Sequence, residues 1–424
     1  MNVTFDGLKN ILKMLRKDID NDIRQSIQVS VVEPAVNDIP TVNIIGTLPT
    51  KKTNVPCVLE YVSSASPFKA NIKIKLQGDS SLIYPKKNFA IELYSDEFFN
   101  IPLNKSFKNW SSQHKYVLKA NYTDHLHARN IACANIWANI VRSRDDFDYL
   151  PEELKTAPNM GAIDGFPIKL YVNGNYQGIY TWNIPRKDWM FNMDKKNVNH
   201  AILQGNTNDF GSNVFKTNPC NFNTPWNGSS YFTVEVGKES DALTESFNRV
   251  INAVINSDFA SLEEYLDIQS AIDYFIFQEV VLGIDGLSNN MLCLTYDIQK
   301  WRLSAYDLDA TFGLTPAGAI EGSSTADMPD AYMNRNSALL NLIKTQYAKD
   351  YKARYSELRK TALSYSSIIS EFENILSIVD EDERIKDTIP YPDIPSVTIN
   401  TFDNLKTFIK ERLDYLDYKY EAVI

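Results

Sequence analysis

The first half of the chain alternates apolar and polar residues in the manner of β-strands. Short runs rich in Val, Ile and aromatic residues are separated by turn-forming residues. This pattern predicts strands over 42–45, 55–62, 72–76, 89–93 and 115–119. Two further runs, 166–172 and 176–182, flank Asn173-Gly174, and this dipeptide is a strong signal for a two-residue hairpin turn.

Helical spacing replaces this alternation farther along the chain. Residues 127–141 predict one helix, and helical patterns resume near Asp241 and dominate to the C-terminus. A second predicted hairpin, over 291–296 and 301–306, interrupts these helices. The stretch 197–232 is rich in Asn, Gly, Ser and Pro, which predicts long surface loops.

Residues 3–28 predict an amphipathic N-terminal helix. Its apolar residues recur with the 3-4-3-4 spacing of a short heptad stripe: Phe5, Leu8, Leu12, Leu15 and Ile19. Two interpretations are open, a helix that packs on the body of the protein or a coiled-coil segment that joins copies or partners. The chain thus divides into this segment (1–30), a β-rich lobe (31–195) and a mainly helical lobe (196–424), an α+β arrangement.

The composition and net charge of the chain disfavour several classes of protein. The 424 residues are 44% hydrophobic and 23% charged, as in folded proteins. Acidic residues outnumber Lys and Arg by 53 to 43, and a net charge of −10 disfavours nucleic acid and anionic membranes as partners. No apolar run is long enough to predict a membrane span. Because the four cysteines, Cys57, Cys133, Cys220 and Cys293, form no C-x-x-C pair and no secretory signal precedes them, we expect reduced thiols and synthesis in the cytoplasm.

Two acidic motifs suggest a site for a divalent ion and a nucleotide. Asp285-Gly-Leu-Ser-Asn-Asn290 precedes the second predicted hairpin, and Asp307-Leu-Asp309 follows it. Mg²⁺ prefers oxygen ligands, and phosphoryl transfer needs positive charge beside the phosphate oxygens. Asp285 would orient the attacking hydroxyl, while Asn290 and Asp307 would hold the metal, and the spacing does not separate Asp307 from Asp309. Asp and Asn are also common loop residues, so a purely structural role is the alternative.

A second motif lies in the β-rich lobe. Gln77-Gly-Asp-Ser-Ser81 forms a predicted turn between strands, and Lys86 and Lys87 follow it. Strand alternation places Lys87 on the same face as the apolar residues of 89–93, where an ammonium group needs an anionic partner such as a nucleotide phosphate. The alternative is that both lysines are solvated residues of an edge strand.

The segment that opens the first predicted helix combines Asp124, His125, His127 and Arg129. We expect Asp124 to cap the helix and Arg129 to reach a carboxylate or a phosphate. A metal site on the two histidines lacks further ligands at useful spacing. The chain also lacks the motifs G-x-S-x-G, H-E-x-x-H and G-x-x-x-x-G-K-S/T, so a hydrolase has little support.

These motifs, in this order, resemble those of the CotH family, spore-coat-type proteins with an atypical protein-kinase-like fold. The segment Gln77-Gly-Asp-Ser-Ser with the following Pro-Lys-Lys-Asn-Phe is similar to the family's Arg-Gly-Asn-Ser-Ser and Pro-Lys-Lys-Ser-Tyr. The hairpin over 170–180 is similar to its Leu-Tyr-x-Asn-Gly-x-Tyr-x-Gly-x-Tyr motif. Further similar segments are 117–130, 285–290 and 306–313.

The resemblance implies a two-lobed kinase-like fold and ATP- and Mg²⁺-dependent phosphorylation of protein Ser or Thr hydroxyls. It implies Asp285 as the catalytic residue. It implies a metal site at Asn290, Asp307 and Asp309, and nucleotide contacts at Gly78, Ser80, Ser81, Lys87 and Arg129. The partners it implies are proteins of a spore coat or a virion.

Three departures from the family pattern keep a second function open. Gln77 replaces the usual Arg, Asp79 replaces the usual Asn, and 181–185 lacks the acidic residue that commonly follows the hairpin. A lost cation and an added carboxylate both disfavour a bound triphosphate. CotH-like domains also occur in phage structural proteins, so the alternative is a non-catalytic structural or binding protein of a phage virion.

Overall fold

The computed structural model describes residues 31–32, 39–205, 215, 232–283, 286–287, 289–327, 337–395, 397–422 and 424. The helix predicted over 3–28 and the residue Asp285 lie outside these ranges. The three described cysteines, Cys57, Cys133 and Cys293, are buried thiols. Among the described helices, none is both long and apolar enough to span a bilayer.

The strands follow the predicted order along the chain. They are β1 Val31–Val32, β2 Thr41–Ile45, β3 Val55–Val62, β4 Phe68–Gln77, β5 Asn88–Tyr94, β6 Ser106–Phe107, β7 Lys115–Lys119, β8 Gly165–Val172, β9 Asn175–Asn183, β10 Ala201–Gly205, β11 Phe232–Val236, β12 Met291–Thr295 and β13 Arg302–Ala305. All the strands predicted from alternation and both predicted hairpins are present.

The described α-helices are α2 Arg129–Arg142, α3 Glu152–Thr156, α4 Asp241–Asn256, α5 Phe259–Tyr265, α6 Ile268–Val281, α8 Ala338–Gln346, α9 Ala348–Arg359, α10 Tyr365–Leu376, α11 Glu381–Asp387 and α12 Phe402–Tyr420. Short 3-10 helices occur at η1 Ser80–Ile83, η2 Phe147–Tyr149, η3 Pro158–Gly161 and η4 Asp188–Phe191. Sheets and helices are thus largely segregated along the chain, which confirms the α+β class.

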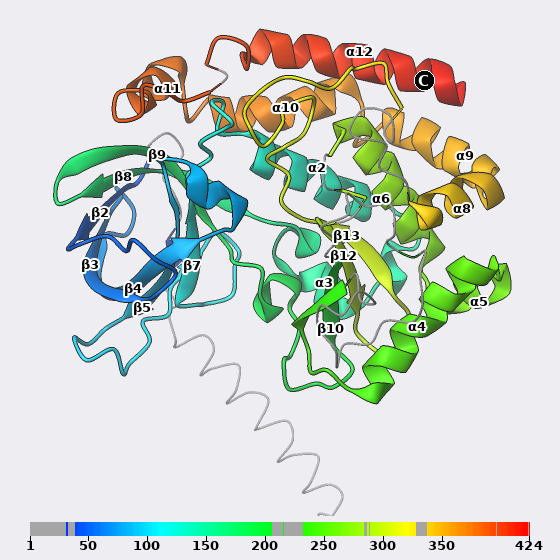
Figure 1. Ribbon diagram of the computed structural model, residues 1–424, viewed down its shortest axis with the longest axis horizontal. Coiled ribbons are helices and arrows are strands. Elements are labelled where there is room, and N and C mark those ends of the chain that lie inside the picture. Colours follow the sequence, from blue (N-terminus) through cyan, green and yellow to red (C-terminus); the bar gives the residue numbers. More distant parts are fainter. Residues whose placement is uncertain are drawn as a thin grey trace, which may run out of the picture.

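Seven strands form a closed barrel in the order β2-β3-β4-β5-β7-β9-β8. Parallel pairing of β2 with β8 completes the barrel, and the other neighbours are antiparallel. Alternate residues of the barrel strands point inward, so that rings such as Tyr61, Tyr116 and Trp182 pack together, and Phe107 of β6 packs against them. The barrel lies at one end of the molecule and most helices at the other (Figure 1).

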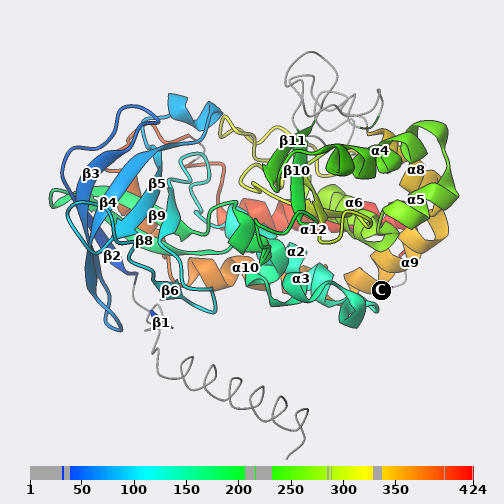
Figure 2. The same ribbon diagram turned by 90° about the horizontal axis from the view of Figure 1, so that it is seen from below.

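A four-stranded sheet has the order β11-β10-β12-β13, and Figure 2 shows its strands β10 and β11 beside the helices, apart from the barrel. Its strand β10 corrects the prediction of long loops over 197–232, which is wrong at 201–205. The apolar residues Ala201, Ile202 and Leu203 are buried there, and β10 pairs with both β11 and β12. The run was too short to be recognised because its β-structure depends on partners distant in sequence.

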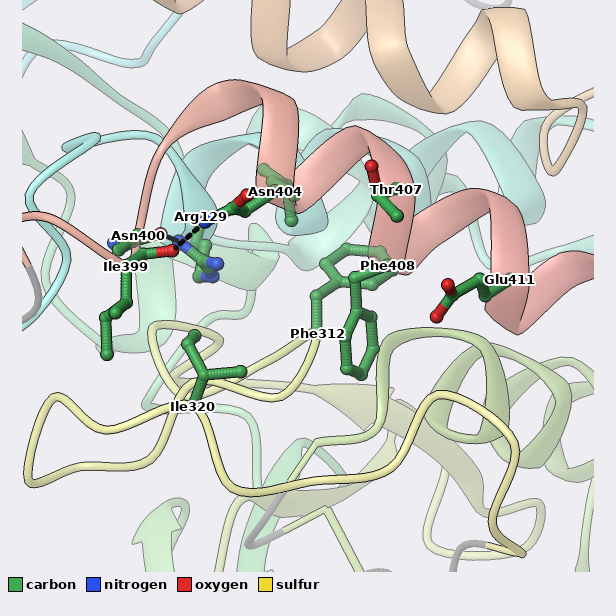
Figure 3. Close-up of a pocket in the computed structure, with 10 residues that line it drawn as sticks. Arg129, Phe312, Ile320, Ile399, Asn400, Asn404, Thr407, Phe408 and Glu411 are labelled. Carbon is green, nitrogen blue, oxygen red and sulfur yellow. Dashed lines mark hydrogen bonds between the residues drawn. The ribbon is translucent and has the colours of Figure 1, made fainter.

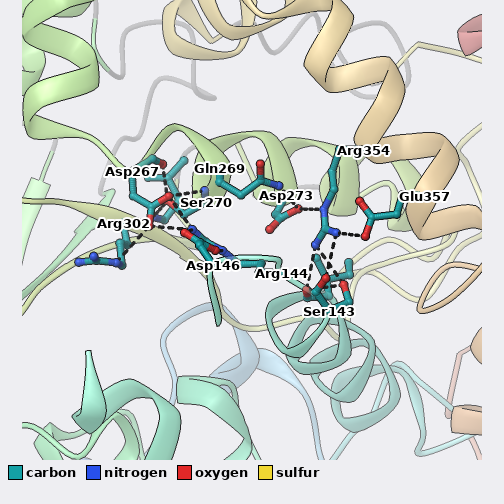
Figure 4. A network of polar contacts seen from close by, with 12 residues as sticks. Ser143, Arg144, Asp146, Asp267, Gln269, Ser270, Asp273, Arg302, Arg354 and Glu357 are labelled. Carbon is teal, nitrogen blue, oxygen red and sulfur yellow. Dashed lines mark hydrogen bonds and ion pairs between the residues drawn. The ribbon is translucent and has the colours of Figure 1, made fainter. Parts of the chain in front are cut away.

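The helix α2 comes early in the chain, yet it packs against α6 and α10 of the helical part. Ion pairs of two largely buried arginines hold its C-terminal end in place (Figure 4). Arg144 pairs with both Asp146 and Asp267 at 2.8 Å. Arg354 of α9 donates to Asp273 of α6 at 2.7 Å and to the carbonyl of the residue after α2 at 3.2 Å. These contacts fix α2, and α2 in turn positions the candidate site.

Candidate functional site

A cavity of about 490 Å³ lies between the barrel and the four-stranded sheet. The predicted residues that line it are Gly78, Ser81, Asn290, Asp307 and Asp309. They come from the turn after β4, from the residue before β12 and from the segment after β13. The tertiary structure therefore brings together groups from the two predicted motifs. The side chains of Ser80 and Asp285 are outside the described part of the chain.

The backbone around Asp307 is held in an unusual conformation. Asp307 has a φ of 53°, in the left-handed region that few residues other than glycine adopt. Its carbonyl oxygen accepts a hydrogen bond from Asn290 Nδ2 at 3.2 Å. The next residue, Leu308, donates its N–H to Asn130 Oδ1 of α2 at 3.0 Å. Backbone strain held by such contacts is a feature that concentrates at functional sites.

Lys119 is the cation that faces Asp307 and Asp309 in this cavity, whose lining also contains Asp79, Glu235 and Arg186. It is the last residue of β7, and its Nζ lies 3.2 Å from Asp307 Oδ1. Burial acts to lower the pKa of Lys119, but the charges of Asp307 and Asp309 hold it above its ordinary value. The ammonium group therefore stays charged. Sequence reasoning missed Lys119, and its position at the polar end of an apolar strand was the available signal.

Asp309 is the second carboxylate of the Asp307-Leu-Asp309 motif, and it also lines the cavity. Burial, together with the nearby charge of Asp307, raises the pKa of Asp309 to about 7. Two carboxylates in a partly dry site repel each other, and a divalent cation would relieve that repulsion. Among the described residues no group of three His, Cys, Asp or Glu could hold a metal. A metal ion between Asp307 and Asp309 would need a further oxygen ligand, and the amide oxygen of Asn290 in the same lining is a candidate. This oxygen set fits Mg²⁺, which keeps several water ligands.

The two lysines of the Pro-Lys-Lys motif lie outside the lining of the cavity. Lys87 Nζ donates to the carbonyl oxygens of Leu82, at 2.6 Å, and of Tyr84, and so holds the turn that contains η1. Lys86 is fully buried and pairs with Asp387 of α11 at 2.8 Å. The interpretation of both lysines as solvated edge residues is wrong for Lys86, because α11 covers it.

Arg129 is buried and does not line the cavity; instead it lines a separate pocket of about 360 Å³ beside α12 (Figure 3). Its guanidinium donates to Asp124 at 2.7 Å, to Asn400 at 2.5 Å and to the carbonyl oxygen of Thr311 at 3.1 Å. Asp124 Oδ2 also accepts from the N–H groups of Ala128 and Arg129 at the start of α2, although the N-cap position is occupied by Ala128 and not by Asp124 as predicted. Arg129 thus ties α2 to the segment that follows Asp309.

The structure shows how strongly Gln77 and Asp79, the departures from the family pattern in the turn after β4, would disfavour an anionic ligand. The Asp79 side chain is 94% exposed and pairs with Lys52, so water screens its charge at the rim of the cavity. The Oε1 atom of Gln77, which lines the cavity, is buried without a hydrogen-bond partner among the described residues. The added carboxylate is therefore a small obstacle to an anionic ligand, and the lost Arg is the larger one.

Comparison with protein families identifies one that matches most of the chain. A family model described as "CotH kinase protein" matches residues 74–416. The match includes all the residues that line the cavity. No curated protein matches the chain.

Proposed function

Because the chain belongs to the CotH family, we propose that it is an ATP- and Mg²⁺-dependent kinase of protein Ser or Thr hydroxyls, with a kinase-like two-lobed fold. The barrel forms one lobe in this proposal, the helices and the second sheet form the other, and the cavity between them binds the nucleotide. The observation that supports it best is the convergence of Asn290, Asp307, Asp309 and Lys119 around one cavity.

In this proposal the residues of the cavity have distinct tasks. Asn290, Asp307 and Asp309 would hold Mg²⁺, which supplies positive charge to the phosphate oxygens. Lys119 would contact a phosphate oxygen, since it is the charged amine nearest to those carboxylates. The turn at Gly78 and Ser81 would cover the phosphates. The proposed catalytic residue Asp285 would accept the proton of the attacking hydroxyl.

Lys119 and Lys87 are alternative candidates for the contact with a nucleotide phosphate, and substitution of each lysine distinguishes them. We expect Lys119→Met to weaken ATP binding in the presence of Mg²⁺ by about tenfold or more, because one charge-assisted contact is lost. Lys87→Met should weaken ATP binding less than Lys119→Met, since the contacts of Lys87 Nζ among the described residues are to backbone carbonyls of its own turn and Lys87 does not line the cavity. Isothermal titration calorimetry with and without Mg²⁺ measures both. A larger loss in the Lys87 variant would reverse the assignment, and wild-type protein that binds no ATP would refute the proposed function.

A second proposal is that the chain is a structural or binding protein of a phage virion or a spore coat, made in the cytoplasm and assembled with other proteins. The replacement of the usual Arg by Gln77 favours it, because the cavity then has fewer cations for a triphosphate. The segment proposed to dock is 3–28. We expect its deletion to reduce the oligomer size measured by light scattering. An unchanged size would remove the role of this segment in assembly.

A further inference from the structure

A second cavity, of about 420 Å³, lies beside the candidate site and gathers basic side chains. We call it the lysine pocket, and the basic residues that define it are His114, Lys115, Lys187 and Lys195. Glu235 of β11 lines both the lysine pocket and the candidate site. The two cavities are therefore neighbours.

Two charges in the lysine pocket are neutralised by partners within the protein. Lys115 pairs with Glu92 of β5 at 2.8 Å. Glu235 pairs with Arg186 at 3.0 Å, and the guanidinium of Arg186 also lies over the ring of Tyr306, 4.6 Å from its centroid. These two pairs contribute little net charge to the pocket.

The remaining charges give the lysine pocket a positive balance. Within the described part of the chain, neither Lys187 nor Lys195 forms an ion pair with a carboxylate. Both are exposed, and the remaining acidic residue of the lining is Asp188. With Lys115 and Glu235 paired, Lys187 and Lys195 against Asp188 leave the lining one excess positive charge, besides His114, in a chain whose net charge is −10. A local positive field of this kind attracts anions.

The pKa of His114 depends on the same positive charges. Burial lowers the pKa of His114, and the charges of Lys115 and Lys195 lower it further, partly opposed by Glu92. An anion bound in the pocket would offset the effect of the lysines and make a protonated His114 more favourable. The pocket could then supply imidazole and ammonium donors together.

The strand β7 runs from the lysine pocket to the candidate site. Lys115 begins this strand and lines the pocket, while Lys119 ends it and lines the site. Four steps along a strand span about 13 Å, which is also the reach of about four residues of an extended peptide. A peptide with its hydroxyl in the site could therefore place a side chain about four residues away in the pocket.

We propose that the lysine pocket binds a phosphoserine or phosphothreonine of the protein substrate, about four residues from the hydroxyl that is modified. A phosphate monoester carries nearly two negative charges and three acceptor oxygens, which suits several converging donors better than one carboxylate does. This substrate class rests on the proposed function. It would make the chain favour substrates that already carry one phosphate.

Binding of labelled peptides without ATP tests the pocket separately from catalysis. The probes are short fluorescein peptides that carry serine, glutamate or phosphoserine about four residues from a second serine. We expect fluorescence anisotropy to show the phosphoserine peptide binding at least about tenfold tighter than the serine peptide. The double variant Lys187→Gln/Lys195→Gln should lose this preference. Lys196→Gln, which changes an exposed lysine outside the lining, is the matched control and should keep it.

Three outcomes would overturn the proposal. They are equal binding of the serine and phosphoserine peptides, an undiminished preference in the double variant, and a glutamate peptide that binds as tightly as the phosphoserine peptide. Because no ATP is present, a preference for phosphoserine would support the pocket even if phosphoryl transfer is never detected. Failure of transfer and failure of the pocket are therefore distinguishable.

Discussion

Replacing Asp307 by alanine is expected to reduce phosphoryl transfer from ATP by roughly 10³-fold or more, because the proposed metal site would lose its central carboxylate. The change also removes the partner of Lys119, whose Nζ lies 3.2 Å from Asp307 Oδ1. Both charges that would position the triphosphate are therefore disturbed by one substitution. Transfer of radiolabelled phosphate to protein, with and without Mg²⁺, measures the effect.

The matched control for this experiment is Asp79→Ala. Asp79 lines the same cavity, but its side chain is 94% exposed and pairs with the exposed Lys52. Surface charges of this kind contribute little, so we expect Asp79→Ala to retain most of the activity. Transfer that persists at the wild-type rate in folded Asp307→Ala protein would contradict the metal assignment. Circular dichroism of both variants checks that the fold is intact.

The second large effect concerns stability. We expect Lys86→Met to lower the free energy of unfolding by about 3–5 kcal/mol, since it leaves the Asp387 carboxylate buried without its ammonium partner. Lys86 Nζ contacts both oxygens of Asp387, at 2.8 and 3.0 Å, and the carbonyl oxygen of Ile179 at 2.6 Å. The pair joins α11 to the barrel. Urea unfolding at neutral pH measures the change.

The Lys86–Asp387 ion pair is packed closely against the backbone at Gly178. Gly178 has a φ of 98°, and a Cβ added there would lie 2.1 Å from Asp387 Oδ1. The second glycine of the hairpin motif is therefore needed so that α11 can approach the barrel. Lys52→Met, which breaks an exposed pair, is the control and should cost less than about 1 kcal/mol. Equal losses in the two variants would refute the importance of the buried pair.

The same pair predicts how stability depends on pH. Burial acts to raise the pKa of Asp387, but the charge of Lys86 and the contact with His127 outweigh it and hold the pKa well below its ordinary value. A carboxylate with a lowered pKa in the folded state stabilises the protein above the pKa of about 3.9 that Asp has when unfolded. This contribution is lost as the pH falls below that value. Unfolding free energies measured between neutral pH and pH of about 3 should therefore decrease less in Asp387→Asn than in the wild type.

Sequence patterns predicted the elements whose structure depends on residues that are close together in the sequence. A period of two residues predicted β3 and β5, because one face of each strand is buried in the barrel. The dipeptide Asn173-Gly174 predicted its hairpin, and both residues adopt the positive φ that such a turn requires. The acidic motifs around 285–290 and 307–309 also indicated a site from the residue types alone.

Only the tertiary structure decided which charged groups face one another. Alternation assigns a side chain to a face but does not say what lies opposite it. Lys86 became the buried cation because α11, some 300 residues later, supplies Asp387. Lys119 rather than Lys87 faces Asp307 because the barrel brings the end of β7 to the cavity, while Arg129 is occupied by Asp124 and Asn400. Long-range ion pairs form between segments whose proximity no local pattern encodes, and these pairs determine the chemistry of the site.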